Sequence, residues 1–200
     1  MATKQLEDFM TEKLASHLQR DQDDDRPIVL MTCGMAGAGK TTLAKHVLLR
    51  WPSFHRLSMD EIINEKHGIY GVDYPASASL YEQYLDEADT IYLSKFHNFL
   101  ADKKNVILEK SFHAKQDRAE WRAVAETAGA RVVFVFLKAE GDAGRELLWE
   151  RICKRSQGAK TANSALDISR ELFDEYWKGF EEPDGEGEIV LKIAGVDTMP

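Results

Sequence analysis

The sequence predicts an α/β protein in which helices cover both faces of a mostly parallel central sheet, a three-layer architecture. The first reason is that short apolar segments alternate along the chain with longer segments whose apolar residues recur every three or four positions. The second is the run 27–33 (PIVLMTC), which is apolar at almost every position, as a parallel strand buried on both faces is. This run stops at a glycine cluster, which predicts a tight turn into the next helix.

The expected elements follow this alternation from one end of the chain to the other. Strands are expected at 27–33, 54–59, 105–108, 131–137 and 188–193. Helices are expected at 1–20, 40–50, 61–66, 79–103, 116–127, 144–155 and 169–180, where apolar residues keep the helical period. Residues 68–75 are expected to form a loop because they contain glycine and proline.

An acidic segment at 21–25 (DQDDD) separates the N-terminal helix from the rest of the chain. We therefore divide the chain into an N-terminal helix with an acidic linker, residues 1–25, and one larger domain, residues 26–200. That domain has enough residues to bury a hydrophobic core. The pattern leaves open whether the N-terminal helix packs on the domain or contacts a partner.

The composition is acidic and narrows the possible partners. Lys and Arg number 26 and Asp and Glu number 34, which gives a net charge of −8 and opposes a nucleic-acid or membrane partner. No apolar run is long enough to span a membrane, and the mixed polar N-terminus is unlike a secretory signal. The two cysteines, Cys33 and Cys153, lie too far apart in sequence for a zinc motif. A cytoplasmic protein is therefore expected, while the oligomeric state is not indicated.

A phosphate-binding loop lies between the first strand of the larger domain and the helix that follows. Residues 34–41 (GMAGAGKT) match G-x-x-x-x-G-K-[ST] at every fixed position, which predicts a P-loop NTPase fold. Glycines let the backbone N–H groups face phosphate oxygens, and the helix N-terminus adds a favourable dipole. Lys40 is expected to bridge the β- and γ-phosphates of ATP, and Thr41 to bind Mg²⁺. The predicted nucleotide-binding residues are Gly34, Met35, Ala36, Gly37, Ala38, Gly39, Lys40, Thr41 and Thr42.

Several classes of P-loop protein are excluded by their missing motifs. The chain contains neither the Asn-Lys-x-Asp motif of GTPases nor the Ser-Gly-Gly-Gln signature of ABC-type ATPases. Residues 86–89 spell the helicase motif DEAD, but they fall inside a long helical pattern instead of following a buried strand. A chain of 200 residues is also too short for two helicase domains.

An ordered series of motifs continues beyond the P-loop. It consists of LSMD at 57–60, VILE at 106–109, Phe112 with the pair at 117–118, ERICKR at 150–155, FEEP at 180–183 and VDT at 196–198. In this order the motifs resemble the zeta-toxin-like or AAA_33 kinase family, which includes chloramphenicol phosphotransferase-like enzymes. The resemblance covers roughly residues 27–198. It implies a P-loop kinase with a helical lid over its site.

The resemblance implies roles for two carboxylates at strand ends. Asp60 stands where such kinases place the group that orients or deprotonates the acceptor hydroxyl; it also suits the N-cap of the helix that follows. Glu109 stands where the family usually has the Asp that orders Mg²⁺ or its water shell. The longer Glu can reach the metal through water, or it can form a structural ion pair with Lys110.

The resemblance also implies a phosphate clamp on the lid. Arg151 and Arg155 are four residues apart and therefore share one helix face. Arginines there would neutralise charge on the transferring phosphoryl group and help to exclude water. The alternative is surface pairing with Glu146 or Glu150. Arg118 is a further candidate for substrate or phosphate contact.

The acceptor pocket is expected between Asp60, the loop 68–75 and the long helix 79–103. Tyr70, Tyr74 and His113 are candidates to line it. The alternatives are that the tyrosines pack the loop and that the histidine is structural.

These observations predict a kinase that transfers the γ-phosphate of ATP to a hydroxyl of a small molecule such as a metabolite, sugar or antibiotic-like compound. A nucleoside or nucleotide kinase remains a rival. A polynucleotide 5′-kinase is opposed by the net charge of −8. A non-catalytic ATP-binding switch or interaction module is the rival from another class, because the Glu109–Lys110 pair departs from the family pattern and the N-terminal helix lies outside it.

Overall fold

A computed structural model describes residues 3–20, 24–162 and 167–193 of the protein. Two parts of the sequence-based expectations lie outside the described residues. They are positions 21–23 of the acidic linker and the motif at 196–198.

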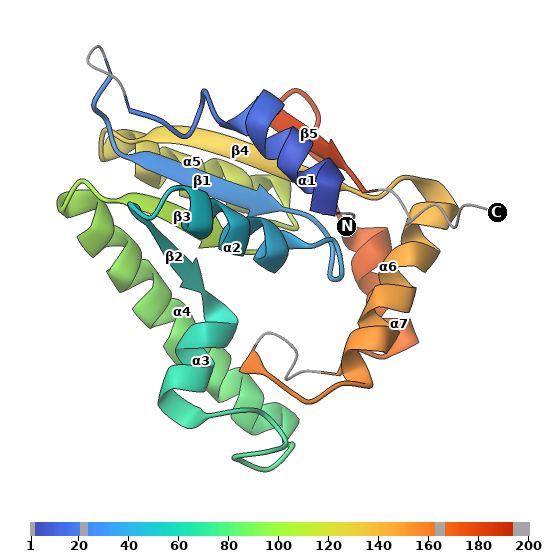
Figure 1. The fold of residues 1–200 in the computed structure, drawn as a ribbon. Coiled ribbons are helices and arrows are strands. Elements are labelled where there is room, and N and C mark those ends of the chain that lie inside the picture. The colour runs from blue at the N-terminus through green and yellow to red at the C-terminus, as the bar shows by residue number, and fades with distance from the viewer. Residues whose placement is uncertain (1–2, 21–23, 163–166, 194–200) are drawn as a thin grey trace.

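The core of the molecule is a five-stranded sheet in the order β2-β3-β1-β4-β5. Its strands are β1 (Ile28–Cys33), β2 (Phe54–Ser58), β3 (Asn105–Glu109), β4 (Arg131–Lys138) and β5 (Glu188–Lys192). Every neighbouring pair is parallel, so the carboxyl ends of all five strands meet at one edge of the sheet (Figure 1). β1 is buried at all six positions because it lies at the centre of the sheet, which explains its continuous apolar run.

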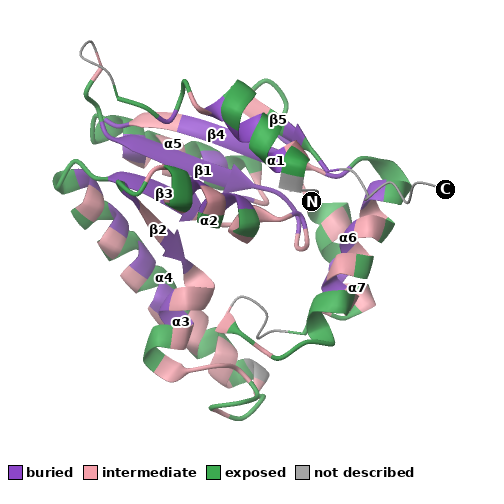
Figure 2. Cartoon of the chain, viewed as in Figure 1, coloured by how far each residue is buried: buried purple, intermediate pink, exposed green. Residues whose placement is uncertain are grey.

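Helices cover both faces of this sheet, as the sequence predicts. They are α1 (Thr3–Phe9), the π-helical turn η1 (Met10–Leu14), α2 (Lys40–Arg50), α3 (Met59–His67), α4 (Ala78–Ala101), α5 (Lys115–Thr127), α6 (Gly141–Ser156) and α7 (Arg170–Gly179). Alternate β1 residues face opposite sides: Leu30 joins a cluster with α1, α2, α6 and α7, and Met31 joins one with α3, α4 and α5. The strands between these layers are largely buried (Figure 2).

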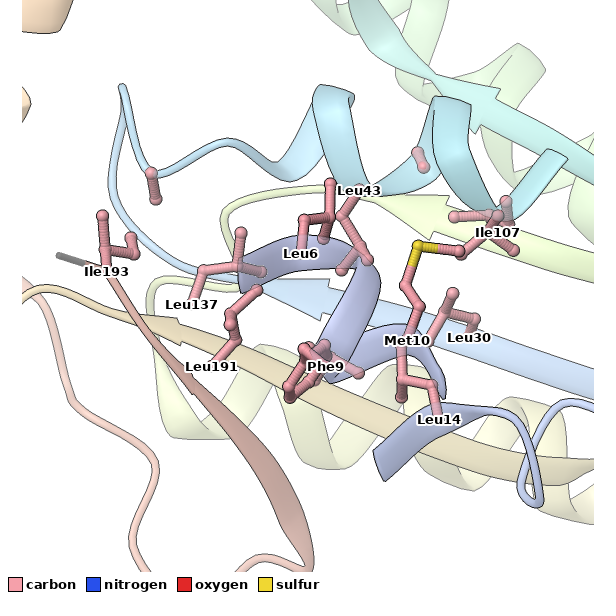
Figure 3. Close-up of a cluster of buried hydrophobic side chains, with 14 of the residues drawn as sticks. Leu6, Phe9, Met10, Leu14, Leu30, Leu43, Ile107, Leu137, Leu191 and Ile193 are labelled. Atoms are coloured by element: carbon pink, nitrogen blue, oxygen red, sulfur yellow. The ribbon is translucent and has the colours of Figure 1, made fainter. Parts of the chain in front are cut away.

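The N-terminal helix is packed into the first of these clusters. Leu6, Met10 and Leu14 are at most 1% exposed and lie against Leu30 of the sheet and Leu43 of α2 (Figure 3). Helical geometry ends at Leu14, before the expected residue 20, and a turn follows. The alternative that the sequence leaves open is therefore decided in favour of packing on the domain.

Other sequence features also find a structural explanation. The DEAD sequence lies in the middle of α4, where Glu87 pairs with His67 at 2.7 Å, so these residues serve helix contacts. Cys33 is fully buried, and burial raises the pKa of its thiol to about 12, which makes it an unreactive core residue. None of the described helices has both the length and the apolar character that a membrane crossing requires.

Candidate functional site

A cavity of about 690 Å³ opens at the carboxyl ends of β1, β2 and β3. Its walls come from the loop between β1 and α2, from α3 and the residues that follow it, and from α6 with the segment beyond it. In Figure 1 the α3–α4 pair and the α6–α7 pair lie on opposite sides of this edge of the sheet. The volume is typical of small-molecule sites, which commonly occupy this position in parallel sheets.

The phosphate-binding loop forms one end of the cavity. Gly34, Gly37 and Gly39 have φ values of 146°, 80° and 102°, which glycine adopts readily. A Cβ at Gly37 would lie 2.8 Å from the carbonyl oxygen of Leu148 in α6, so the loop also packs tightly against α6. The Lys40 ammonium donates to the carbonyl oxygens of Gly34 and Met35 at 2.7 and 3.0 Å. Burial lowers the pKa of Lys40, and a bound phosphate would offset that cost.

The predicted nucleotide-binding residues divide into two groups. Those that line the cavity are Ala36, Gly37, Gly39, Lys40, Thr41 and Thr42. Met35 and Ala38 instead bury their side chains in the core, at 6% and 1% exposure, and contribute to the loop through their backbone. Gly34 connects β1 to the loop, and its N–H donates to the carbonyl oxygen of Ser111 at 3.1 Å.

Thr41, Glu109 and Arg56 form a connected group beside this loop. The Thr41 hydroxyl donates to one carboxylate oxygen of Glu109, and Arg56 Nε donates to the other at 2.5 Å. The Arg56 and Glu109 side chains are only 6% and 7% exposed. The expected alternative, a pair between Glu109 and Lys110, does not form, because Lys110 pairs with Asp89 at 3.3 Å.

Thr41 and Glu109 have the oxygen donors that Mg²⁺ requires. A hydroxyl and a carboxylate at the P-loop fit this hard cation, which usually takes its remaining ligands from phosphates and water. Over the described residues, no group of three or more His, Cys, Asp or Glu side chains could hold a metal ion. Thr41 and Glu109 therefore suit a Mg²⁺ ion that binds together with the nucleotide. Among the described residues, the protein alone does not offer a complete set of metal ligands.

Asp60 lies across the cavity from the phosphate-binding loop. It is in the first turn of α3, which begins at Met59 directly after β2. The N-cap expectation is therefore wrong by two residues, since Ser58 holds that position. Burial, followed by the nearby charge of Glu109, raises the pKa of Asp60 above its usual value. A carboxylate that binds a proton more readily than usual is suited to act as a base.

Arg151 and Arg155 both line the cavity from α6. Arg151 Nη1 lies 3.5 Å from the Gly37 carbonyl oxygen, and partial burial lowers the pKa of Arg151. The positive charge of Arg155 lowers the pKa of both Lys40 and Asp60, so Arg155 is close enough to influence both groups. Glu146, offered above as a surface partner, pairs instead with Arg170 at 2.6 Å.

Tyrosines form the end of the cavity beyond Asp60. Tyr70 and Tyr74 line it as expected, and Tyr81 from α4 joins them. The Tyr70 ring meets Tyr81 and Tyr74 edge-on, with centroids 5.2 and 5.8 Å apart. The Tyr74 hydroxyl is buried and has no hydrogen-bond partner among the described residues. The loop 68–75 thus uses its tyrosines both to pack and to line the cavity.

Two of the predicted substrate-binding residues lie elsewhere. Arg118 is 1% exposed, and its guanidinium donates to both Glu186 carboxylate oxygens at 2.7 and 2.8 Å and to the Phe112 carbonyl oxygen at 2.9 Å. It is therefore a structural anchor between α5 and the segment before β5. His113 packs edge-on against Phe180, 5.4 Å between centroids, and does not line the cavity. The structure therefore does not bring Arg118 or His113 together with the other predicted substrate-binding residues.

Sequence reasoning also missed several residues in or beside the cavity, of which only Tyr81 left a detectable signal. Arg56 of β2 forms an ion pair with Glu109 of β3. The two residues meet because β2 and β3 are neighbours in the sheet, and the spacing of residues in the sequence does not reveal that pairing. Tyr81 was visible in the helical period of α4 but was assigned no role. Asn64 and Ser111 also line the cavity, yet single polar residues at such positions carry no distinctive pattern.

The parallel sheet and the phosphate-binding loop define a P-loop NTPase-like protein of the kinase type, a fold that implies nucleotide binding. The model of the AAA_33 family, described as an AAA domain, matches residues 29–183, more than half of the chain. This chain belongs to that family. A search of the curated proteins finds no match.

Solved structures share this fold at low sequence identity. A protein of Chloroflexus aurantiacus, provisionally described as a kinase, is 18% identical with a TM-score of 0.65, over 84% of this chain and 88% of that one. Kti12 of Chaetomium thermophilum, solved with ADP-AlF3, is 16% identical with a TM-score of 0.56, over 82% and 88%.

A third match is to part of a longer chain that was solved within a complex. A chain of the Pnkp1/Rnl/Hen1 RNA repair complex is 19% identical with a TM-score of 0.58, over 77% of this chain. This chain spans 44% of the length of that one. Identities of this size show a shared fold and leave the substrate to the site itself.

Proposed function

We propose that this protein is an ATP-dependent kinase that transfers the γ-phosphoryl group to a hydroxyl of a small molecule. One observation carries the proposal. A single cavity holds Lys40 of the phosphate-binding loop, the half-buried carboxylate of Asp60 and the lid arginines Arg151 and Arg155. A nucleotide-binding module without transfer has no need of a proton acceptor facing its phosphate site, whereas a kinase does.

Each group has a task that its position suits. Lys40 and the loop N–H groups hold the β- and γ-phosphates, and Thr41 with Glu109 holds Mg²⁺, which neutralises phosphate charge when bound. Asp60 accepts the proton of the acceptor hydroxyl as that oxygen bonds to the γ-phosphorus and the bond to the β,γ-bridging oxygen breaks, releasing ADP. Arg151 and Arg155 stabilise charge on the phosphoryl oxygens and help to keep water out.

The first test compares Lys40→Ala with Asp60→Asn in a screen of ATP consumption against pooled sugars, nucleosides, antibiotics and other hydroxyl metabolites. Lys40→Ala should lose both nucleotide binding and transfer. Asp60→Asn should retain binding of ATP and slow transfer by about 10²–10⁴-fold, because the amide cannot accept the proton. Asp86→Asn makes the same chemical change on the exposed face of α4 and should leave both properties unchanged.

The outcomes separate the proposal from its rivals. Stimulation of ATP loss by one pool, above the Lys40→Ala background, supports a kinase and begins to identify the acceptor. Full transfer activity in Asp60→Asn would contradict the role given to Asp60. Tight ATP binding with no stimulation by any pool would favour a non-catalytic nucleotide switch.

A further inference from the structure

The end of the cavity beyond Asp60 differs in chemistry from the phosphate end. We infer that it binds an uncharged polyhydroxylated ring, a free sugar or a nucleoside, and discriminates against phosphorylated or carboxylated acceptors. The inference rests on the proposed kinase function and names the acceptor class of that site. It is carried by three observations: hydrogen-bonding groups that the protein leaves unused, aromatic faces, and the placement of the cations.

Five polar side chains at this end have hydrogen-bonding capacity that the protein does not use. They are Asp60, Asn64, Tyr70, Tyr74 and Tyr81, and all five line the cavity. None of these side chains forms a hydrogen bond with another described residue. Buried polar groups normally have partners, and the Tyr74 hydroxyl is buried with none. A ligand with several hydroxyl groups would supply the missing partners.

The same end presents rings together with these polar groups. The Tyr70 ring contacts both Tyr74 and Tyr81 edge-to-face, an arrangement that fixes the ring positions before a ligand arrives. Tyr84 and His67 stack behind them at 3.5 Å and support the loop. Rigid tyrosines offer both an apolar surface and a hydroxyl, which suits a ring with C–H faces and an edge of hydroxyl groups.

The four cations that line the cavity lie near the phosphate-binding loop or pair with a carboxylate. Lys40 binds loop carbonyls and Arg151 lies beside Gly37, while the charge of Arg155 acts on Lys40 and Asp60. The fourth, Lys110, pairs with Asp89 and lies 4.7 Å from the centroid of the Trp121 ring. These groups would face the phosphates of ATP or are already neutralised.

Among the described residues, Lys160 lies beside the tyrosines and already has a carboxylate partner. Lys160 lies 6.0 Å from the centroid of the Tyr70 ring, and it pairs with Asp167 at 2.9 Å. The residues outside the described ranges contain no Lys, Arg or His in the sequence, so none of their side chains adds a cation. An acceptor phosphate or carboxylate would instead face the carboxylates of Asp60 and Glu109, which repel it.

Matched pairs of acceptors test the inference on the full-length protein with Mg²⁺. Galactose is compared with galacturonate, and uridine with uridine 5′-monophosphate. Binding is followed by saturation-transfer NMR in the presence of a non-hydrolysable ATP analogue, and transfer by ADP release. We expect the uncharged member of at least one pair to bind and react at least about tenfold better than its anionic counterpart, and the pair that responds distinguishes a sugar from a nucleoside.

Variants locate the preference in the cavity. Tyr81→Phe removes one lining hydroxyl and should raise the KM of the uncharged acceptor about fivefold with little change in kcat, since one neutral hydrogen bond is lost. Tyr84→Phe removes a hydroxyl from the same aromatic cluster outside the cavity lining and serves as the matched control. Asn64→Lys adds a cation to the lining and should reduce the preference for the uncharged member.

The outcomes distinguish failure of the inference from failure of the kinase proposal. Preferred transfer to the anionic members, or equal transfer to both, overturns the inference and leaves the kinase proposal intact. If no compound is phosphorylated, the kinase proposal loses its support from this set, and binding decides the inference. In that case, the inference is supported if an uncharged member binds preferentially and Tyr81→Phe weakens that binding. The inference is overturned if no uncharged member binds.

Discussion

The two ends of the cavity are built in different ways. The phosphate end comes from one continuous segment, residues 34–42, whose backbone conformation and following helix create the site locally. The acceptor end combines Asp60 and Asn64 of α3, tyrosines of the next loop, Tyr81 of α4 and residues beyond α6. The first end is rich in cations and backbone groups, whereas the second is rich in neutral hydroxyls.

This difference matches what each end has to recognise. A triphosphate has a fixed geometry and charge, so a short motif can specify its site. An acceptor varies from one enzyme to another, and its site must be assembled from segments that can change independently. Variants that change nucleotide binding, acceptor binding or transfer separately therefore test whether the two ends act independently.

Of a change at Arg155, a change at Gly37 and the pH dependence of Asp60, the largest effect is expected for Arg155. Arg155→Ala should lower the transfer rate by about 10²–10³-fold, because the phosphoryl oxygens lose a charge that compensates their own during transfer. Nucleotide binding should weaken much less, which equilibrium titration with ATP beside single-turnover transfer rates would show.

The matched control for this variant is Arg145→Ala. Arg145 is on the same helix and pairs with Asp174 at 2.6 Å, away from the cavity lining. This partly exposed pair lies outside the cavity, so the control should transfer normally. Equal losses in both variants would point to damage to α6 instead of a lost contact with phosphate.

A smaller effect, confined to the phosphate end, is expected for Gly37→Ala. The added Cβ would lie 2.8 Å from the Leu148 carbonyl oxygen at a φ of 80°, so the loop or α6 must shift. We expect nucleotide affinity to fall about tenfold or more by isothermal titration, with acceptor binding in saturation-transfer NMR unchanged.

Gly129→Ala separates the clash from backbone strain. Gly129 has nearly the same φ, 78°, but nothing lies within 4 Å of an added Cβ. The control should therefore be destabilised by about 1 kcal/mol without a change in nucleotide affinity. The same loss of affinity in both variants would show that strain, and not the contact with α6, is responsible.

The smallest effect near neutral pH is expected for the pH dependence of the transfer rate, which reflects the protonation of Asp60. Because burial and Glu109 raise its pKa, the base form is lost at a higher pH than for an ordinary Asp, whose pKa is about 3.9. The transfer rate should fall about tenfold per pH unit below that raised pKa and level off above it. The residual rate of Asp60→Asn should lack this acidic limb in a pH–rate profile, and a limb that persists would belong to another group.

Much of the fold could be predicted from the sequence because it depends on local pattern. The continuous apolar run of β1, the glycine loop and the helical period of α4 each carry their signal within a few residues, and the structure confirms them. The exact ends of the helices and strands could not be predicted as well as their presence. Asp60 was expected before its helix, but α3 begins at Met59 without a loop after β2.

Side-chain roles at a distance could not be predicted in the same way. Arg118 beside an acidic residue in sequence looked available for a phosphate, but folding buries it against Glu186, 68 residues later. A pair between Glu109 and Lys110 was expected, but Glu109 instead meets Arg56 of the neighbouring strand, and Lys110, which follows β3, pairs with Asp89 of α4.

The sequence by itself determined the alternation of strands and helices and the phosphate-binding loop, because these follow from the periodicity and backbone freedom of adjacent residues. Only the tertiary structure decided that the N-terminal helix belongs to the core, that Arg118 is an anchor and that three tyrosines converge beyond Asp60. Such contacts depend on which distant segments become neighbours, and that is settled when the sheet and its two helical layers pack together.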